Sequence, residues 1–166
     1  MPTTISEPRD LFVTALTEML YVEEKLAGEV LPELHKDVRT PEFKDGVERH
    51  IQETRRHAEN LERVFELLGE EPKPDKSHSL DGLVAQREKV IKNIESDDVR
   101  EVFNAGAAAK TEHLEIAAYE SMIKTAEGLG QSEIVDLLEE NLADEKDTLK
   151  EVEKVADKLS KETAKR

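Results

Sequence analysis

Residues 11–30 read LFVTALTEMLYVEEKLAGEV, and this stretch decides the fold. Its apolar positions advance by alternating steps of four and three residues, the spacing of a helix that packs along the seam of a helical bundle. The seam positions are Phe12, Leu16, Met19, Glu23, Leu26 and Val30. A carboxylate therefore stands within an apolar seam, where its burial is costly unless a positive partner accompanies it.

Later segments repeat this pattern, and each carries an acidic residue near its middle. The periodicity predicts long helices over residues 7–37, 41–68, 97–127 and 132–161, and a shorter helix over residues 80–94. Glu112 and Glu145 occupy the seams of the third and fourth long helices. Glu53 lies at the edge of the second seam, between His50 and His57. Four carboxylates at one depth of a bundle suggest a shared positive partner, and a pair of metal ions is the simplest one.

Several residues mark the expected helix ends. We expect Ser6, Thr40 and Ser132 to cap the starts of three helices, because a hydroxyl can accept a hydrogen bond from the first turn. Gly69 should end the second helix, and Pro32 should kink or end the first.

The lengths of the connections predict the arrangement of the helices. Short turns join the first long helix to the second and the third to the fourth, so each pair is antiparallel. Residues 70–96 are enough chain to cross the bundle from end to end, with a short helix of their own. We therefore expect an all-α, ferritin-like four-helix bundle of two antiparallel hairpins with an additional helix in the crossover. The length fits a single domain covering residues 1–166.

The acidic residues and histidines near the middle of the helices are candidate metal ligands. They are Glu23, His50, Glu53, His57, Glu112, Glu115 and Glu145. Oxygen and imidazole ligands suit iron and manganese, so we expect two Fe or Mn ions per chain. Such bundles usually supply a Glu-x-x-His pair from two helices. Here His57 follows Glu53 by four residues, and no histidine follows Glu145, so the site would be poor in nitrogen. Each histidine is either a ligand or a hydrogen-bonded core residue, and His50 could instead orient a ligand carboxylate.

Composition narrows the classes of partner. The net charge is −15, from 39 acidic and 24 basic residues, which argues against nucleic acid as the ligand. The absence of cysteine excludes disulfides and thiolate metal sites. No apolar run is long enough to span a membrane, and the polar first residues do not resemble a signal peptide. We expect a cytoplasmic protein without membrane partners; a high-salt habitat is an alternative source of the acidity, although lysine is not depleted.

Spaced motifs in all four long segments resemble those of the YciE/YciF-type ferritin-like stress proteins. They are LTEMLYVEEKL (residues 16–26), LP (31–32), HIQET (50–54), DGL (81–83), EHLEIA (112–117) and DEK (144–146). The resemblance implies a ferritin-like bundle with a crossover helix, usually dimeric, a candidate di-metal centre and a link to stress responses. It carries over Glu23, Glu53, Glu112 and Glu145, and less firmly Glu115 and the two histidines. It implies no settled enzymatic activity.

The sequence departs from this family at two positions. Leu20 stands where the family often has tyrosine, and Leu149 where it often has aspartate. The second departure removes a polar group next to Glu145.

Three functions remain open from the sequence. The first is a di-iron or di-manganese protein that oxidises ferrous iron or reacts with dioxygen or peroxide. The second is a metal-free or vestigial-site bundle that acts as a structural stress protein. The third is a partner-binding module, in which an apolar strip on the crossover helix forms a homodimer contact. That strip comprises Leu80, Leu83, Val84, Val90 and Ile91.

Overall fold

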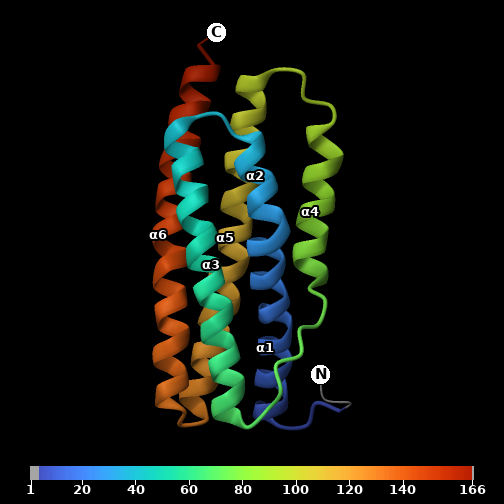
Figure 1. Cartoon of the computed structure of the whole chain (residues 1–166), viewed down its shortest axis with the longest axis vertical. Coiled ribbons are helices and arrows are strands. Elements are labelled where there is room, and N and C mark those ends of the chain that lie inside the picture. The colour runs from blue at the N-terminus through green and yellow to red at the C-terminus, as the bar shows by residue number, and fades with distance from the viewer. Residues whose placement is uncertain (1–3, 166) are drawn as a thin grey trace.

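The computed structural model describes residues 4–165 and is helical along most of that length (Figure 1). The first long helix comprises α1 (Pro8–Lys25), a π-helical turn η1 (Leu26–Val30) and α2 (Leu31–Asp37). The others are α3 (Pro41–Leu68), the crossover helix α4 (His78–Ile91), α5 (Asp97–Gly128) and α6 (Ser132–Thr163).

The predicted ferritin-like fold is confirmed. Two hairpins, one from α1 to α3 and one from α5 to α6, pack side by side, and α4 runs along the outside of the bundle (Figure 1). Helix α1 contacts α3 and α5, and α6 also contacts α3 and α5, so the four long helices close into a ring. The apolar seams meet inside this ring and form one core, from Phe12 and Phe65 near one end to Phe43 near the other.

The helix ends agree with the sequence at some positions and differ at others. Thr40 is the N-cap of α3, as predicted, but its hydroxyl makes no capping hydrogen bond; Gly69 ends the helix as predicted, with the left-handed φ of 70°. The predictions for Ser6 and Ser132 were each wrong by one residue, because Glu7 and Gln131 are the N-caps. At the first of these ends, Asp10 accepts hydrogen bonds from the backbone N–H groups of Ser6 (3.0 Å) and Glu7 (3.1 Å), which fixes the start of the helix.

The first long helix neither ends at Pro32 nor stays regular before it. The turn that precedes Pro32 is a π-helix, in which the Leu31 N–H donates to the Leu26 carbonyl five residues earlier. A proline ring clashes with the carbonyl four residues before it, and a wider turn is one way to relieve that clash. The predicted irregularity is therefore present, but it lies one turn earlier and the helix continues to Asp37.

The crossover helix is tied to the first hairpin by polar contacts. Asp81 accepts hydrogen bonds from Tyr21 Oη (2.8 Å) and Lys25 Nζ (2.7 Å), and Ser77 Oγ donates to Glu18 Oε1 (2.8 Å). Leu80 is buried in the bundle core, so it does not belong to an exposed strip. The predicted homodimer contact through the rest of α4 stays a prediction. Among the described residues, no helix is long and apolar enough to cross a membrane.

Gly46 offers a test of helix stability at a position inside α3. A Cβ atom there would lie 3.9 Å from Arg49 Nη2 and 4.0 Å from Glu151 Oε2, which is ordinary van der Waals contact. Glycine inside a helix costs about 0.5–1 kcal/mol relative to alanine, so Gly46→Ala should raise the free energy of unfolding by about that amount in urea denaturation. The control is Gly69→Ala, which should lower stability because alanine disfavours the left-handed φ of 70°. Destabilisation by Gly46→Ala would contradict the packing described for α3.

Candidate metal centre

Six of the seven candidate ligands meet in the middle of the bundle. Glu23 comes from α1, His50 and His57 from α3, Glu112 and Glu115 from α5, and Glu145 from α6. Their exposed fractions are between 0 and 3 %. The heptad-like spacing of each helix turns these positions inward, so that one layer of the core is polar while the neighbouring layers are apolar.

The six side chains form two groups, each of the size that one metal ion needs. His50, Glu112, Glu115 and Glu145 form the first group, and Glu23, His57 and Glu145 form the second. Within each group, one ligand atom of every residue lies within 4.8 Å of the others. Glu145 belongs to both groups: its Oε2 faces His50 and its Oε1 faces His57.

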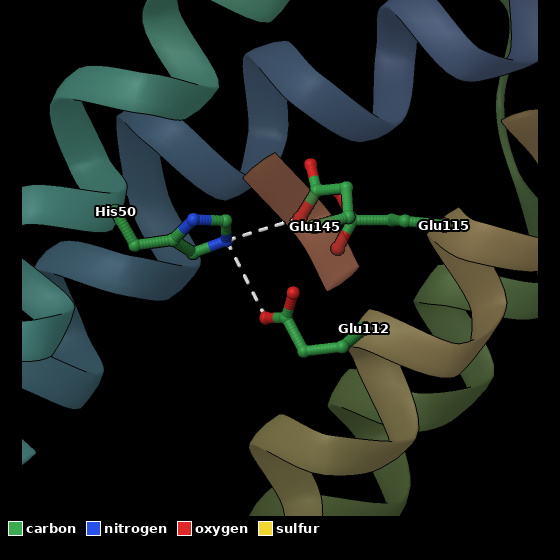
Figure 2. Close-up of side chains that lie close together, drawn as sticks. All are labelled: His50, Glu112, Glu115 and Glu145. Atoms are coloured by element: carbon green, nitrogen blue, oxygen red, sulfur yellow. Dashed lines mark ion pairs between the residues drawn. The ribbon is translucent and has the colours of Figure 1, made fainter. Parts of the chain in front are cut away.

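In the first group, the ring of His50 points toward carboxylates of two other helices (Figure 2). Its Nε2 lies 3.4 Å from Glu112 Oε1 and 3.7 Å from Glu145 Oε2. In the second group, His57 Nδ1 lies 2.8 Å from Glu145 Oε1 and 3.6 Å from Glu23 Oε2. Imidazole nitrogens therefore face carboxylate oxygens in both groups.

The hydrogen bonding of these side chains is incomplete. Among the described residues, all eight buried side-chain N and O atoms that lack a hydrogen-bond partner belong to these six residues. They are Glu23 Oε2, His50 Nε2, His57 Nδ1, Glu112 Oε2, both carboxylate oxygens of Glu115 and both of Glu145. Buried polar atoms in folded proteins are nearly always paired, so eight unpaired atoms at one place call for a specific partner. The Glu145–His57 contact is a short ion pair that does not meet the geometry of a hydrogen bond.

Burial and mutual repulsion shift the pKa values of these carboxyl groups. Burial raises the pKa of Glu112 and that of Glu115 well above the usual range, and the charge of Glu145 raises both further. Burial also raises the pKa of Glu23, although the contact with His57 opposes this. For Glu145, burial raises the pKa, but the contacts with His57 and His50 outweigh it and leave the pKa lowered.

The pKa of the His57 imidazole is shifted in the opposite direction from that of an isolated buried histidine. Burial by itself lowers its pKa, but Glu145 and Glu23 favour the imidazolium and raise the pKa to about 10. Without metal, these shifts favour a proton on His57 and on the carboxyl groups of Glu112 and Glu115. Metal ions would replace these protons, as they do in sites whose ligands must be deprotonated.

A buried polar network holds Glu23 from behind. Tyr119 Oη donates to Glu23 Oε1, and Asn141 Nδ2 donates to Tyr119 Oη (3.0 Å) and to the His57 carbonyl (3.2 Å). Burial and the neighbouring charge of Glu23 raise the pKa of Tyr119 well above its usual value, so the phenol stays protonated and can donate. Sequence reasoning missed Asn141, although its position four residues before Glu145 on the same helix face was a usable signal.

The far nitrogens of both histidines also have partners. His57 Nε2 lies 3.2 Å from Asp144 Oδ2, and His50 Nδ1 lies 3.4 Å from Glu53 Oε2 and 3.3 Å from Thr148 Oγ1. Carboxylates in such positions fix the ring orientation of metal-binding histidines. Glu53 is the one candidate ligand outside both groups; it lies between His50 and Arg49, whose Nε is 3.8 Å from Glu53 Oε1.

The residues present fit iron or manganese. The first group offers three carboxylates and an imidazole, and the second offers two carboxylates and an imidazole, with Glu145 shared. Oxygen-rich sites with some imidazole suit Mn²⁺ and Fe²⁺. The unpaired ligand atoms are those that such ions would pair with.

Comparisons with known proteins agree with this architecture. A family profile described as domain of unknown function DUF892 matches residues 7–165. Protein YciF of Escherichia coli K12 is 31 % identical over 140 residues, which is 84 % of each chain. The crystal structure of the E. coli stress protein YciF superposes with a TM-score of 0.88 at 27 % identity, covering 95 % of this chain and 99 % of that one.

Two further solved structures share the fold. YcfI from Rhodopseudomonas palustris, described as a candidate structural protein, has a TM-score of 0.88 at 28 % identity and covers 92 % of this chain and 97 % of its own. A protein from Xanthomonas campestris pv. campestris has a TM-score of 0.76 at 20 % identity over 97 % of this chain and 98 % of its own, a likeness of fold alone. From the profile match and the identity to YciF together, the chain belongs to the DUF892 family of YciF-type ferritin-like proteins.

Proposed function

We propose that the protein binds two iron or manganese ions in the middle of its bundle and uses them to react with dioxygen or a peroxide. The observation that carries this proposal is the set of eight unpaired buried polar atoms, all on six side chains drawn from four helices. An apolar or fully hydrogen-bonded layer would cost less, so the retained carboxylates argue for a cation as their partner.

In this proposal each ion has its own ligands and Glu145 is common to both. His50, Glu112 and Glu115 hold the first ion, and Glu23 and His57 hold the second. Ferrous ions at such a site supply one electron each to a bound oxidant. The chain contributes orientation: Tyr119 and Asn141 hold Glu23, and Asp144 fixes the ring of His57.

The expected physiological setting is a stress response. This follows the description of the E. coli relative as a stress protein. The chain has no cysteine, so it lacks the thiolate iron site that would relay electrons in a rubrerythrin-type peroxidase. Electrons would have to come from a separate donor or from ferrous iron itself.

Metal content per chain tests the proposal directly. Protein purified without chelators or a polyhistidine tag, then loaded anaerobically with ferrous iron, should hold about two ions per chain by plasma mass spectrometry, since the two groups are of the size that bundle di-metal sites use. Glu145→Ala should lose both ions, whereas Glu23→Ala and Glu115→Ala should each lose one. The matched control is Glu120→Ala, an exposed carboxylate on α5 that pairs with Lys146.

The same experiment decides the role of Glu53. If Glu53→Ala lowers affinity by about 10–100-fold but keeps two ions at saturation, Glu53 acts by orienting His50. If the variant cannot hold two ions at any concentration, Glu53 is a ligand, as the sequence predicts. Failure of the wild-type protein to fill on loading would contradict the proposed function.

A metal-free structural role is the second candidate. It is favoured by the direction of the pKa shifts, because raised pKa values on Glu112 and Glu115 let protons neutralise the layer without any ion. It is also in line with the description of YcfI. Substoichiometric metal that no loading increases would support this second candidate.

A further inference from the structure

A cavity of about 530 Å³ lies beside the first ligand group, between α2, α3, α5 and α6. Its inner end is formed by His50 and Glu112, and its outer end lies among charged residues of α3 and α6. The cavity therefore connects the candidate metal centre with the side of the bundle.

The walls of this cavity are mostly apolar. The apolar part is formed by Leu31, Leu34, Phe43, Val47, Ala108, Val152 and Val155, and Asp45 and Thr148 add polar side chains to the lining. At the inner end, His50 Nε2 and Glu112 Oε2 are buried and lack hydrogen-bond partners. A molecule in the cavity would therefore contact hydrocarbon along its body and reach the first ligand group at one end.

Ion pairs between α3 and α6 border the outer end. Arg49 pairs with Glu151, and Glu42 Oε1 lies 3.7 Å from Lys154 Nζ. These charges lie at the rim, where solvent screens them. Because these charges are screened, the apolar walls are the main determinant of what the cavity binds.

The volume is much larger than the smallest oxidants require. A water molecule occupies about 30 Å³ in the liquid, and dioxygen or hydrogen peroxide is only slightly larger than that. Sites for small organic molecules span roughly 300–1,000 Å³ and are predominantly apolar with a few placed polar groups. The cavity of about 530 Å³ falls within that range.

We propose that this cavity binds an organic hydroperoxide, with its hydrocarbon body between α3 and α6 and its peroxide end at His50 and Glu112. The proposal rests on the proposed di-metal function and names the class of oxidant that the site takes. Reduction of such a substrate breaks its O–O bond with two electrons and two protons, and it yields an alcohol and water. The two electrons equal one from each of two ferrous ions, so no further reductant is needed for a single turnover.

Gly46 gives a means to close the cavity without touching a ligand. It lines the cavity on α3, and a Cβ there would point toward Arg49 Nη2 and Glu151 Oε2 at 3.9 and 4.0 Å. A phenylalanine at this position would fill space that the organic body needs. Gly106→Phe is the matched control, because Gly106 is also a helical glycine but is exposed, and a Cβ added there would meet no atom within 4 Å.

The test is binding of cumyl alcohol, the product of cumene hydroperoxide reduction, to metal-free protein, followed by methyl resonances in NMR titration. We expect shifts at the methyl groups of Val47, Val152 and Val155 in the wild type and in Gly106→Phe. The affinity of Gly46→Phe should fall at least about tenfold, as expected when an apolar site loses its volume. If Gly46→Phe does not fold, Val152→Phe replaces it as the variant that fills the cavity from α6.

Manganese content of the same variants, measured on separate samples after loading with Mn²⁺, separates the two proposals. Equal affinity in the wild type and the filled variants, or shifts only at other methyl groups, overturns the cavity assignment even if two ions are bound. Alcohol binding by a protein that takes up no metal overturns the hydroperoxide assignment together with the proposed function. Loss of alcohol binding in Gly46→Phe with unchanged manganese content supports both.

Discussion

Loading the metal-free protein with Mn²⁺ should raise its melting temperature by roughly 10–20 °C. An ion that binds only the folded state at a free concentration 100-fold above its dissociation constant contributes about 2.7 kcal/mol, and two such ions contribute about twice that. For a domain of this size, each kcal/mol shifts the midpoint by about 2–4 °C. Manganese is the suitable ion here because it does not oxidise readily during the measurement.

The physical origin of this large shift is the state of the centre without metal. Glu112, Glu115 and Glu145 bring three carboxyl groups into a layer that water does not reach. Burial, and then repulsion by the charge of Glu145, raises the pKa values of Glu112 and Glu115. An ion would remove that repulsion and pair the unsatisfied oxygens in one step.

Two controls make the thermal experiment specific. Mg²⁺ at the same concentration screens the net charge of −15 to the same extent, so it controls for general charge screening. It should raise the melting temperature only a little, because a site with imidazole ligands suits manganese better. Glu145→Ala should show no manganese-dependent shift, since Glu145 belongs to both ligand groups. The same melting temperature for wild-type protein with and without Mn²⁺ would argue against the di-metal function.

Much of the fold and part of the site could be predicted from the sequence. The apolar seam of α1 predicted that Glu23 faces the core, and equivalent seams in α5 and α6 predicted the same for Glu112 and Glu145. Each of these positions follows from helical periodicity alone. The crossover topology followed from the length of residues 70–96. These features depend on spacing within one segment, which a single sequence contains.

Features that depend on how two helices are rotated against each other could not be read in this way. The partners of His57 and Tyr119 on α6 are Asp144 and Asn141, at sequence separations of 87 and 22 residues. Glu53 was expected at the same depth as Glu23, Glu112 and Glu145 as a candidate ligand, yet it lies behind His50, because its place at the edge of the seam turns it toward Arg49. The cavity was also beyond prediction, since it arises where side chains of four helices leave space unfilled.

Replacing Glu115 with methionine should stabilise the metal-free protein by about 1–4 kcal/mol at neutral pH, the range found when buried charged groups are replaced by apolar ones. Glu115 is fully buried, and neither carboxylate oxygen has a hydrogen-bond partner. Methionine has a similar length and a flexible side chain, so it can occupy the same space. The variant should bind only one manganese ion, because Glu115 belongs to one of the two ligand groups.

The stabilisation should depend on pH, and its sign follows from the raised pKa of Glu115. Below the ordinary carboxyl pKa of 4.5, Glu115 is protonated in both the folded and the unfolded chain. Its titration therefore does not change the free energy of unfolding in that pH range. As the pH rises above that value, the unfolded chain ionises while the folded protein keeps its proton, so the wild type loses stability until the folded-state pKa is reached. The variant lacks this loss, and the difference between the two proteins should therefore be larger near about pH 8 than near about pH 5.

Urea denaturation in the presence of a chelator, at both pH values, measures this difference. Glu115→Gln is the matched control: it removes the titration but leaves a buried amide, so it should abolish the pH dependence with less stabilisation than methionine. His57, with a pKa raised to about 10, also makes the folded protein lose stability as the pH rises above 6.5, but it does so in all three proteins and cancels in the comparison. A Glu115→Met protein that is less stable than the wild type would mean that Glu115 is already paired without metal. A more stable variant that has lost one ion would instead show that this carboxylate is kept for the ion and not for the fold.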